Sequence, residues 1–230
     1  KKRLLNRLDY RILASKKYRK AKTYFIANSQ HTFDYYSKNV PRNQRKNVRL
    51  LQYGFNFEKY FHQKQIAPIE KIRLVNVGSY QVKKNHAFFV DLAIALKNKG
   101  VHFEINLIGH GTEFEAIKNK IAEFQLEEFV FQRGLQSNVQ DWYQQSDLYI
   151  HAATYEPFGL VFLEAMAAGL PAITLDGKGN RDLIENDKNG FLFHEQDAEK
   201  FADKIIEYAS DNEKYGQIST YAQEYSKQFD

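Results

Sequence analysis

Two glutamates, Glu156 and Glu164, flank the expected start of a helix and could together bind a polar ligand. The segment Phe158-Gly159-Leu160 marks that start, so we expect Glu156 in a loop and Glu164 one and a half turns into the helix. A helix N-terminus offers unpaired backbone N–H groups and a partial positive charge, which suit a phosphate. Carboxylates cannot bind that phosphate, but they accept hydrogen bonds from sugar hydroxyls. One surface therefore offers groups for a phosphate and for a sugar.

The glutamate pair has a second interpretation, because an acid in the first turns of a helix stabilises the helix dipole without any ligand. The residues around the pair favour a site. Residues 154–171 read Thr-Tyr-Glu-Pro-Phe-Gly-Leu-Val-Phe-Leu-Glu-Ala-Met-Ala-Ala-Gly-Leu-Pro. This stretch closely resembles the Glu-x7-Glu signature of the glycosyl transferases group 1 family. Members of that family are retaining glycosyltransferases with two Rossmann-like domains, the GT-B architecture.

The resemblance implies a role for each group of the signature. Glu156 would contact hydroxyls of the transferred sugar, and Glu164 would contact the ribose of the nucleotide. The backbone N–H groups at the helix start would face the pyrophosphate or the sugar, namely those of Phe158, Gly159 and Leu160. None of these residues resembles a covalent nucleophile, so Glu156 is interpreted as a group that positions the sugar.

The loop that follows the first expected strand of the sheet, Gly78 to Asn85, resembles the phosphate loop of the same family. The family form is Gly-Arg-Leu followed, three residues later, by Lys-Gly, and its Arg and Lys neutralise the departing diphosphate. Gly78 and Lys84 match, whereas Ser79 stands where Arg is usual. A missing guanidinium removes a strong bidentate contact, which Lys83 could replace. The alternative for Lys84 is an exposed residue before a helix.

Further glycine-rich segments follow other expected strands. By resemblance, Gly134 and Leu135 lie where the family's backbone meets the nucleobase, although the sequence does not choose between a UDP-linked and a GDP-linked donor. Gly177-Lys178-Gly179 indicates either a mobile, backbone-exposed loop near the donor sugar or a plain connector.

Two titratable residues on the strand before the signature have simpler interpretations. His151 is expected in the core, and Asp147 is expected to be a structural carboxylate.

The elements that must position these residues alternate between short β-type runs and amphipathic helical runs from Ile72 onward. The expected strands are 72–77, 103–108, 129–132, 147–151, 172–175 and 191–193. The expected helices are 85–98, 112–124, 138–145, 160–168, a short one near 182–185, and 198–209. This alternation predicts an α/β fold with a doubly wound parallel sheet. Ligands bind beyond the carboxyl ends of such strands, where all the candidate segments fall.

Residues 1–50 are not part of that pattern, and residues 51–230 are expected to form a C-terminal Rossmann-like domain that binds a nucleotide sugar. Within residues 1–50 the sequence predicts a basic helix over 4–22, a strand over 24–27, a helix over 29–37 and a polar linker over 41–47. By resemblance, this region is the tail of an N-terminal domain plus a linker. We therefore expect the chain to be mostly the donor-binding half of a GT-B protein and incomplete for turnover alone.

The charge of the chain is divided unevenly. Residues 1–50 contain 15 Lys or Arg and 2 Asp or Glu, whereas the remaining residues contain 18 basic and 26 acidic ones. Residues 1–22 hold ten of the basic residues with leucines and isoleucine between them. They are interpreted either as a solvated helix packed on another domain or as a surface for anionic lipid headgroups. Nucleic acid is a weaker interpretation, because no recognised motif accompanies the tyrosines.

Composition excludes several other classes. No apolar run approaches the roughly 20 residues that span a bilayer, and the absence of Cys excludes disulfides and thiolate chemistry. Because Asp and His show no ligand spacing, we expect no metal or cofactor, and we expect a cytoplasmic location with a peripheral membrane contact. The sequence thus predicts transfer of a sugar from a nucleotide diphospho-sugar to a glycan, glycolipid or cell-envelope polymer. The alternatives are a nucleotide-sugar-binding module without turnover and a sugar-nucleotide epimerase of related architecture.

Overall fold

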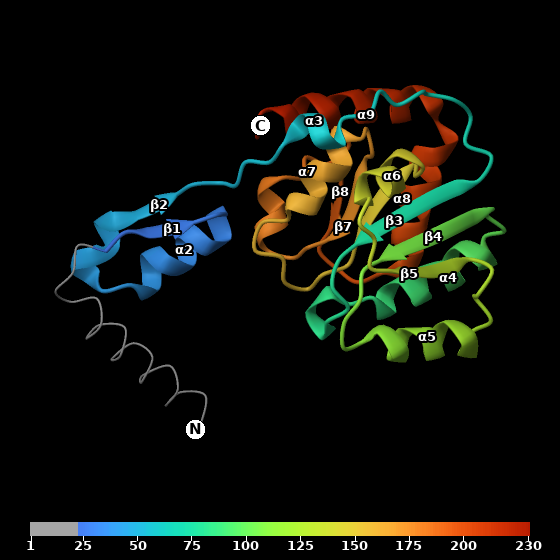
Figure 1. The fold of residues 1–230 in the computed structure, drawn as a ribbon, viewed down its shortest axis with the longest axis horizontal. Coiled ribbons are helices and arrows are strands. Elements are labelled where there is room, and N and C mark those ends of the chain that lie inside the picture. Colours follow the sequence, from blue (N-terminus) through green and yellow to red (C-terminus); the bar gives the residue numbers. More distant parts are fainter. Residues whose placement is uncertain (1–22) are drawn as a thin grey trace. The chain divides into compact units, whose positions relative to one another are not determined.

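The computed structural model describes residues 23–230 (Figure 1), so the predicted basic helix over 4–22 lies outside the described residues. The chain divides into two compact units, Lys1–Tyr53 and Gly54–Asp230. No helix among the described residues is both long enough and apolar enough to cross a bilayer.

The first unit pairs two short parallel strands, β1 (Phe25–Ala27) and β2 (Val48–Leu50). Between them lie the helix α2 (Gln30–Asn39) and a 3₁₀-helix, η1 (Arg42–Asn47). Helix α2 begins after Ser29, whose hydroxyl accepts a hydrogen bond from the backbone N–H of Thr32 at 3.3 Å. The sequence predicts a linker where η1 lies and does not predict β2. Neither element shows a clear hydrophobic period. Both form because backbone N–H and C=O groups need hydrogen-bond partners, which η1 finds within itself and β2 finds in β1.

The second unit contains one parallel sheet of six strands in the order β5-β4-β3-β6-β7-β8. Their bounds are β3 (Ile72–Val77), β4 (Phe103–Ile108), β5 (Val130–Gly134), β6 (Leu148–His151), β7 (Ala172–Leu175) and β8 (Gly190–Phe193). Strand β3 pairs with β4 on one side and with β6 on the other, so the winding direction reverses between β3 and β6. The predicted doubly wound parallel sheet is confirmed, and its ligand crevice is expected at this reversal.

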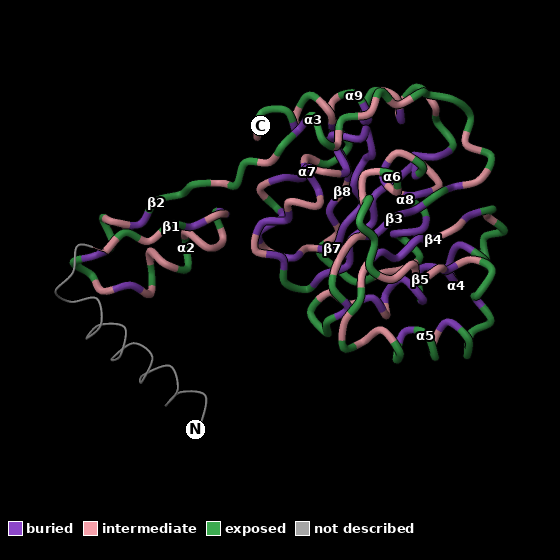
Figure 2. The backbone as a smooth tube through the Cα atoms, in the orientation of Figure 1, coloured by how far each residue is buried: buried purple, intermediate pink, exposed green. Residues whose placement is uncertain are grey.

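Helices cover both faces of the sheet, because the central strands β3, β4, β6 and β7 direct apolar side chains to two separate hydrophobic clusters. Ile150 belongs to one cluster and Tyr149, beside it in β6, belongs to the other. The first cluster is completed by α4 (Ala87–Asn98), α5 (Phe114–Glu123) and α8 (Ala198–Ser210). The second is completed by α6 (Val139–Gln144) and α7 (Leu160–Ala167). Figure 2 shows β6 and β7, near the middle of the sheet, as buried.

The last helix, α9 (Asn212–Lys227), and the short α3 (Phe57–Tyr60) are not predicted from the sequence. Helix α9 places Tyr215 in the first cluster and Ala222 in the second, so it closes both sides of the sheet. Its buried face also contains Ser219 and Ser226, which weaken the apolar period. Apart from these elements, the predicted strands and most predicted helices match the observed bounds to within two residues. The short helix predicted near 182–185 is wrong, because η3 forms over Gly179–Asp182 instead.

Candidate functional site

The loops that follow the strands meet at one rim of the second unit, as the parallel sheet requires. The loop after β3 is hydrogen-bonded to its neighbours on both sides. The N–H of Gly78 donates to the carbonyl of Ile108 at 3.0 Å, at the end of β4. The N–H of Thr154 donates to the carbonyl of Lys83 at 2.9 Å, which ties the loop after β6 to it. The two loops that carry the predicted phosphate and sugar groups therefore lie against each other.

Lys84 and Glu156 form an ion pair across these two loops. The Lys84 Nζ lies 2.5 Å from Oε2 of Glu156, and the two side chains are only 17% and 10% exposed. Burial alone would raise the pKa of Glu156, but His151 and Lys84 outweigh it and lower that pKa to about 2. Lys84 is thus not merely an exposed residue before a helix. Ser79, by contrast, is exposed at the rim and Gly78 is half-buried beside it.

His151 contacts the same carboxylate from the end of β6. Its Nε2 lies 3.4 Å from Oε2 of Glu156, and its Nδ1 lies 3.0 Å from the hydroxyl of Tyr149. The sequence correctly predicts that His151 is buried, since it is 2% exposed. It does not predict the contact with Glu156, because nothing in the local pattern says that the strand end faces the following loop.

The segment after β7 fixes the main chain of Glu156. The N–H of Glu156 donates to the carbonyl of Gly177 at 2.7 Å, and the N–H of Gly179 donates to the carbonyl of Glu156 at 2.9 Å. A Cβ on Gly179 would come within 1.9 Å of the carbonyl oxygen of Pro157. Of the two interpretations of this segment, the backbone-exposed loop is wrong, because both glycines are buried where another loop packs on their main chain. The other interpretation, a connector, fits these contacts.

Lys178, between these glycines, has a strained backbone with φ of 79° and ψ of −61°. The N–H of Gly179 also donates to the carbonyl of Gly177 at 3.2 Å, which closes a three-residue turn around Lys178. Strain of this kind persists only where the surrounding structure imposes it. Here the pairing with the Glu156 loop imposes it.

Helix α7 begins next to Glu156. Its N-cap, Gly159, has φ of 100°, and a Cβ there would come within 2.5 Å of the Phe162 ring and 3.2 Å of Cγ of Glu156. The side chain of Phe158 is buried, at 1% exposure, so only its main chain can face a ligand. Leu160 begins the helix and is half-buried. Since Phe158 and Gly159 are buried, any ligand at the helix start would meet backbone groups there and not these side chains.

Glu164, the second glutamate of the signature, lies within α7 between tyrosines. The Tyr143 hydroxyl donates to Oε2 of Glu164 at 3.0 Å, and the Tyr60 hydroxyl also acts to lower the pKa of this carboxyl. Burial raises the pKa of Glu164, and the two hydroxyls oppose that rise. The two signature glutamates thus have opposite electrostatic environments. Tyr60 and Tyr143 are part of this arrangement and have no counterpart in the sequence reasoning.

The predicted base-binding segment lies at the end of β5. Gly134 has φ of 66°, and its carbonyl accepts a hydrogen bond from the N–H of Gly109 at 2.8 Å. Leu135 is 81% exposed. This segment lies on the same rim as the loop after β4, and its exposed apolar side chain is available to a flat ligand.

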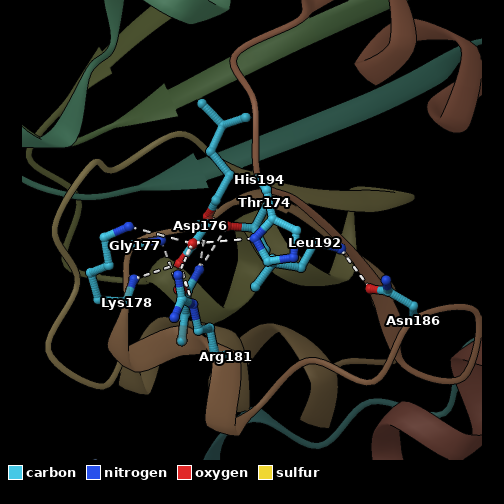
Figure 3. Close-up of polar contacts among 10 residues, drawn as sticks. Thr174, Asp176, Gly177, Lys178, Arg181, Asn186, Leu192 and His194 are labelled. Atoms are coloured by element: carbon cyan, nitrogen blue, oxygen red, sulfur yellow. Dashed lines mark hydrogen bonds and ion pairs between the residues drawn. The ribbon is translucent and has the colours of Figure 1, made fainter. Parts of the chain in front are cut away.

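Asp176, which directly follows β7, is surrounded by basic side chains that the sequence does not predict. Arg181, Lys178 and His194 are directed toward its carboxylate in Figure 3. The Nε of Arg181 donates at 2.8 Å, and the Nδ1 of His194 lies at 3.3 Å. Burial would raise the pKa of Asp176, but Arg181 and the other donors hold that pKa well below the usual range.

Asp147 is structural, as predicted, since its carboxylate accepts a hydrogen bond from the backbone N–H of Arg73 at 2.9 Å.

Comparison with known proteins gives relatives that are longer than this chain. It is 31% identical over 159 residues to N-acetyl-alpha-D-glucosaminyl L-malate synthase of Bacillus anthracis, covering 69% of this chain and 41% of the relative. It is 28% identical over 156 residues to poly(glycerol-phosphate) alpha-glucosyltransferase of Bacillus subtilis, covering 67% of this chain and 23% of the relative. The chain thus spans less than half the length of these two proteins.

Solved structures share the fold. HepE from Anabaena, in complex with UDP and glucose, matches with a TM-score of 0.82 at 23% identity, over 97% of this chain and 63% of HepE. TarM from S. aureus matches with a TM-score of 0.77 at 20% identity, over 89% of this chain and 41% of TarM. These matches confirm the predicted Rossmann-like half of a GT-B architecture. Residues 57–225 match the family described as glycosyl transferases group 1. Since that match covers most of the chain and both signature glutamates, the chain belongs to the glycosyl transferases group 1 family.

Proposed function

We propose that this chain binds a nucleotide diphospho-sugar at the rim between β3 and β6 and is the donor-binding half of a retaining glycosyltransferase. The observation that carries the proposal is the contact of Lys84 with Glu156 beside the start of α7. It brings a cation, a carboxylate and a helix N-terminus to the point where the winding of the sheet reverses. These are the groups that a diphosphate and a sugar require.

Each part of the donor has a matching group in this arrangement. Lys84, with Gly78, Ser79 and the start of α7, would bind the diphosphate. Glu156 would accept hydrogen bonds from sugar hydroxyls.

The nucleoside has its own groups on the same rim. Glu164 would accept hydrogen bonds from the ribose, supported by Tyr143. Gly134 and Leu135 would contact the base. The donor is a substrate here, and the proposal requires no metal or cofactor.

In the proposed reaction the bond between the anomeric carbon and the diphosphate oxygen breaks, and the electron pair leaves with the diphosphate. Lys84 and the helix N-terminus stabilise that developing charge. The acceptor hydroxyl oxygen bonds to the anomeric carbon from the face that the diphosphate leaves, and its proton passes to a phosphate oxygen. The anomeric configuration is therefore retained. Glu156 holds the sugar while its ring gains positive charge.

The names of the relatives bear on the acceptor. They include a poly(glycerol-phosphate) alpha-glucosyltransferase and glycosyltransferases of colanic acid and amylovoran biosynthesis. We propose a glycan, glycolipid or cell-envelope polymer as the acceptor, at the cytoplasmic face of a membrane. Ten basic residues within residues 1–22 favour an anionic lipid surface. Anionic vesicles should retain the chain at low salt and release it at high salt. Equal retention on neutral vesicles would contradict this location.

Donor binding is tested by calorimetric titration of the chain with UDP, GDP, ADP and their sugars, without added metal. We expect selective binding of one nucleotide class, weakened by Glu164→Ala and unchanged by Glu115→Ala, an exposed glutamate of α5. Turnover with an acceptor, measured on a full-length form that contains both domains, should give a product of retained anomeric configuration by NMR. An inverted product would contradict the retaining mechanism, and binding of no nucleotide would contradict the donor site.

One observation favours a second function, a nucleotide-sugar-binding module without turnover. Ser79 replaces the Arg that is usual in the family's phosphate loop, and Lys83 is exposed and engages the Thr154 loop through its carbonyl. Such a module would bind the donor with no transfer or hydrolysis, whichever acceptor is offered. Hydrolysis or transfer of the donor sugar by a full-length form, abolished by Glu156→Gln, would exclude it.

A further inference from the structure

His151 is enclosed by groups from four parts of the rim. It lies at the end of β6, with Tyr149 two residues before it on the same strand. Glu156 and Lys84 approach from the two loops, and the Phe162 ring of α7 lies 4.8 Å from the imidazole. The imidazole is 2% exposed, so the protein fixes which groups can contact it.

The chemistry of these neighbours assigns the proton on the imidazole. An ionised carboxylate only accepts hydrogen bonds, so the nitrogen that faces Glu156, Nε2, must carry the proton. In a neutral ring Nδ1 is then an acceptor, and the Tyr149 hydroxyl, 3.0 Å away, donates to it. Burial lowers the pKa of His151, which keeps the ring neutral. A directed series results: Tyr149 donates to His151, and His151 N–H points to Glu156.

His86 is the other histidine near this site and does not compete for the same carboxylate. Its ring stacks on Tyr80 with centroids 3.9 Å apart, and neither of its nitrogens has a hydrogen-bond partner among the described residues. Burial, with the nearby His151 and Lys84, lowers the pKa of His86 to about 3. A second neutral histidine adds no charge next to Glu156.

The Glu156 carboxylate therefore accepts one side-chain hydrogen bond, from the Lys84 ammonium at 2.5 Å, and the Nε2 of His151 lies nearby at 3.4 Å. The longer His151 contact is not a formed hydrogen bond, since Nε2 has no partner within hydrogen-bond geometry in the described part of the chain. A diphosphate carries more negative charge than one carboxylate and attracts Lys84 more strongly. When Lys84 moves, Glu156 keeps one donor within reach.

We propose that His151 is a positioning residue that holds the Glu156 carboxylate when Lys84 turns to the diphosphate of the donor. This inference rests on the proposed function, because it requires a diphosphate at Lys84 and a sugar at Glu156. In this proposal Lys84 exchanges the Glu156 carboxylate for the diphosphate, and His151 is the donor that remains beside Glu156. His151 itself touches neither the sugar nor the diphosphate.

The test compares His151→Leu, which removes the donor at similar volume, with His151→Gln, which keeps an N–H near the position of Nε2. His102→Leu, an exposed histidine before β4, is the matched control. The probes are UDP and UDP-glucose, measured by calorimetry on the 230-residue chain. Because Glu156 faces the sugar, His151→Leu should weaken UDP-glucose by about tenfold or more and leave UDP unchanged. His151→Gln should restore most of the loss.

A double-mutant cycle separates this role from a general loss of structure. Adding His151→Leu to Glu156→Gln should cost no further affinity for UDP-glucose. Equal weakening of UDP and UDP-glucose by His151→Leu would overturn the proposal, as would no weakening of either. If wild type selects GDP or ADP in place of UDP, the same comparison is made with that nucleotide and its sugar, and failure to bind any nucleotide of the panel would instead contradict the proposed function.

Nuclear magnetic resonance tests the tautomer of His151 and its contact with Glu156 without any added nucleotide sugar. The ¹⁵N shifts of its ring should report a neutral Nε2–H tautomer between pH 5.5 and 8, and Glu156→Gln should shift the Nε2 resonance. The opposite tautomer, or no change in Glu156→Gln, would overturn the assigned contact.

Discussion

The Nζ of Lys84 lies 2.5 Å from Oε2 of Glu156, although 72 residues separate them in the sequence. The pair joins the loop after β3 to the loop after β6, the two strands between which the sheet reverses its winding. Because both side chains are mostly buried, their charges interact in a partly desolvated site. The two opposite charges therefore offset each other at the rim.

Glu156→Gln should destabilise the chain at neutral pH. The carboxylate has a folded pKa of about 2, below its ordinary value of 4.5. A depressed pKa means that its contribution is fully present above the unfolded pKa and is lost as pH falls toward 2. We expect a loss of about 1–3 kcal/mol in the free energy of unfolding at pH 7, because Lys84 loses its charged partner. Urea unfolding at pH 7 and at pH 3 measures it, and a gap that widens toward pH 3 would contradict the argument.

Glu164→Gln should change the free energy of unfolding in the opposite direction to Glu156→Gln, and it is the matched comparison for that variant. Burial raises the pKa of Glu164 above its ordinary value. A raised pKa means that ionisation is disfavoured in the folded chain, so stability is greatest below the unfolded pKa and falls as pH rises through the folded one. The neutral amide avoids that loss, so the variant should equal or exceed wild type by up to about 1 kcal/mol at pH 7. A loss as large as that of Glu156→Gln would show that Tyr143 and Tyr60 outweigh burial.

Gly179→Ala should break the contact between the loop after β7 and the Glu156 loop. Its Cβ would come within 1.9 Å of the Pro157 carbonyl oxygen, so one backbone must move. We expect a loss of about 2–4 kcal/mol together with weaker donor binding. Gly216→Ala is the control: it lies inside α9, its Cβ would meet Ile66 at 3.4 Å, and it should stabilise by about 0.5–1 kcal/mol. Thermal melting compares both variants with wild type.

Lys178→Gly should relieve the strained turn. At φ of 79° a glycine has no steric penalty, so the folded chain should gain up to about 1 kcal/mol, less the entropy of a more flexible unfolded chain. Lys178→Ala removes the ammonium, which lies 3.5 Å from Asp176, but keeps the strained backbone. This variant therefore measures the contribution of the ion pair alone to stability. If Lys178→Gly and Lys178→Ala lower the free energy of unfolding by the same amount, the ion pair with Asp176 contributes more to stability at this position than the backbone strain does.

Local patterns determined a large part of this protein. Alternating apolar runs gave β3, β4 and β7 at their observed bounds, and the signature placed Glu164 in a helix that starts after Gly159. Helix α9 is not predicted from the sequence, because serines interrupt its buried face. Its apolar period is therefore weak even though Tyr215 and Ala222 are buried. The helix is stabilised by packing against both hydrophobic clusters. Its partners in that packing lie elsewhere in the sequence, so the local pattern cannot predict it.

The sequence alone thus determined which elements form and which loops reach the rim, because hydrophobic period and turn residues act over a few residues. Only the tertiary structure decided which side chains meet there. It paired Lys84 with Glu156, aimed His151 at the same carboxylate, and placed Tyr143 on Glu164. These contacts depend on strand order and on how loops from distant segments pack. The opposite pKa directions of the two glutamates follow from that packing, since one buried carboxylate gained a cation and the other gained only hydroxyls.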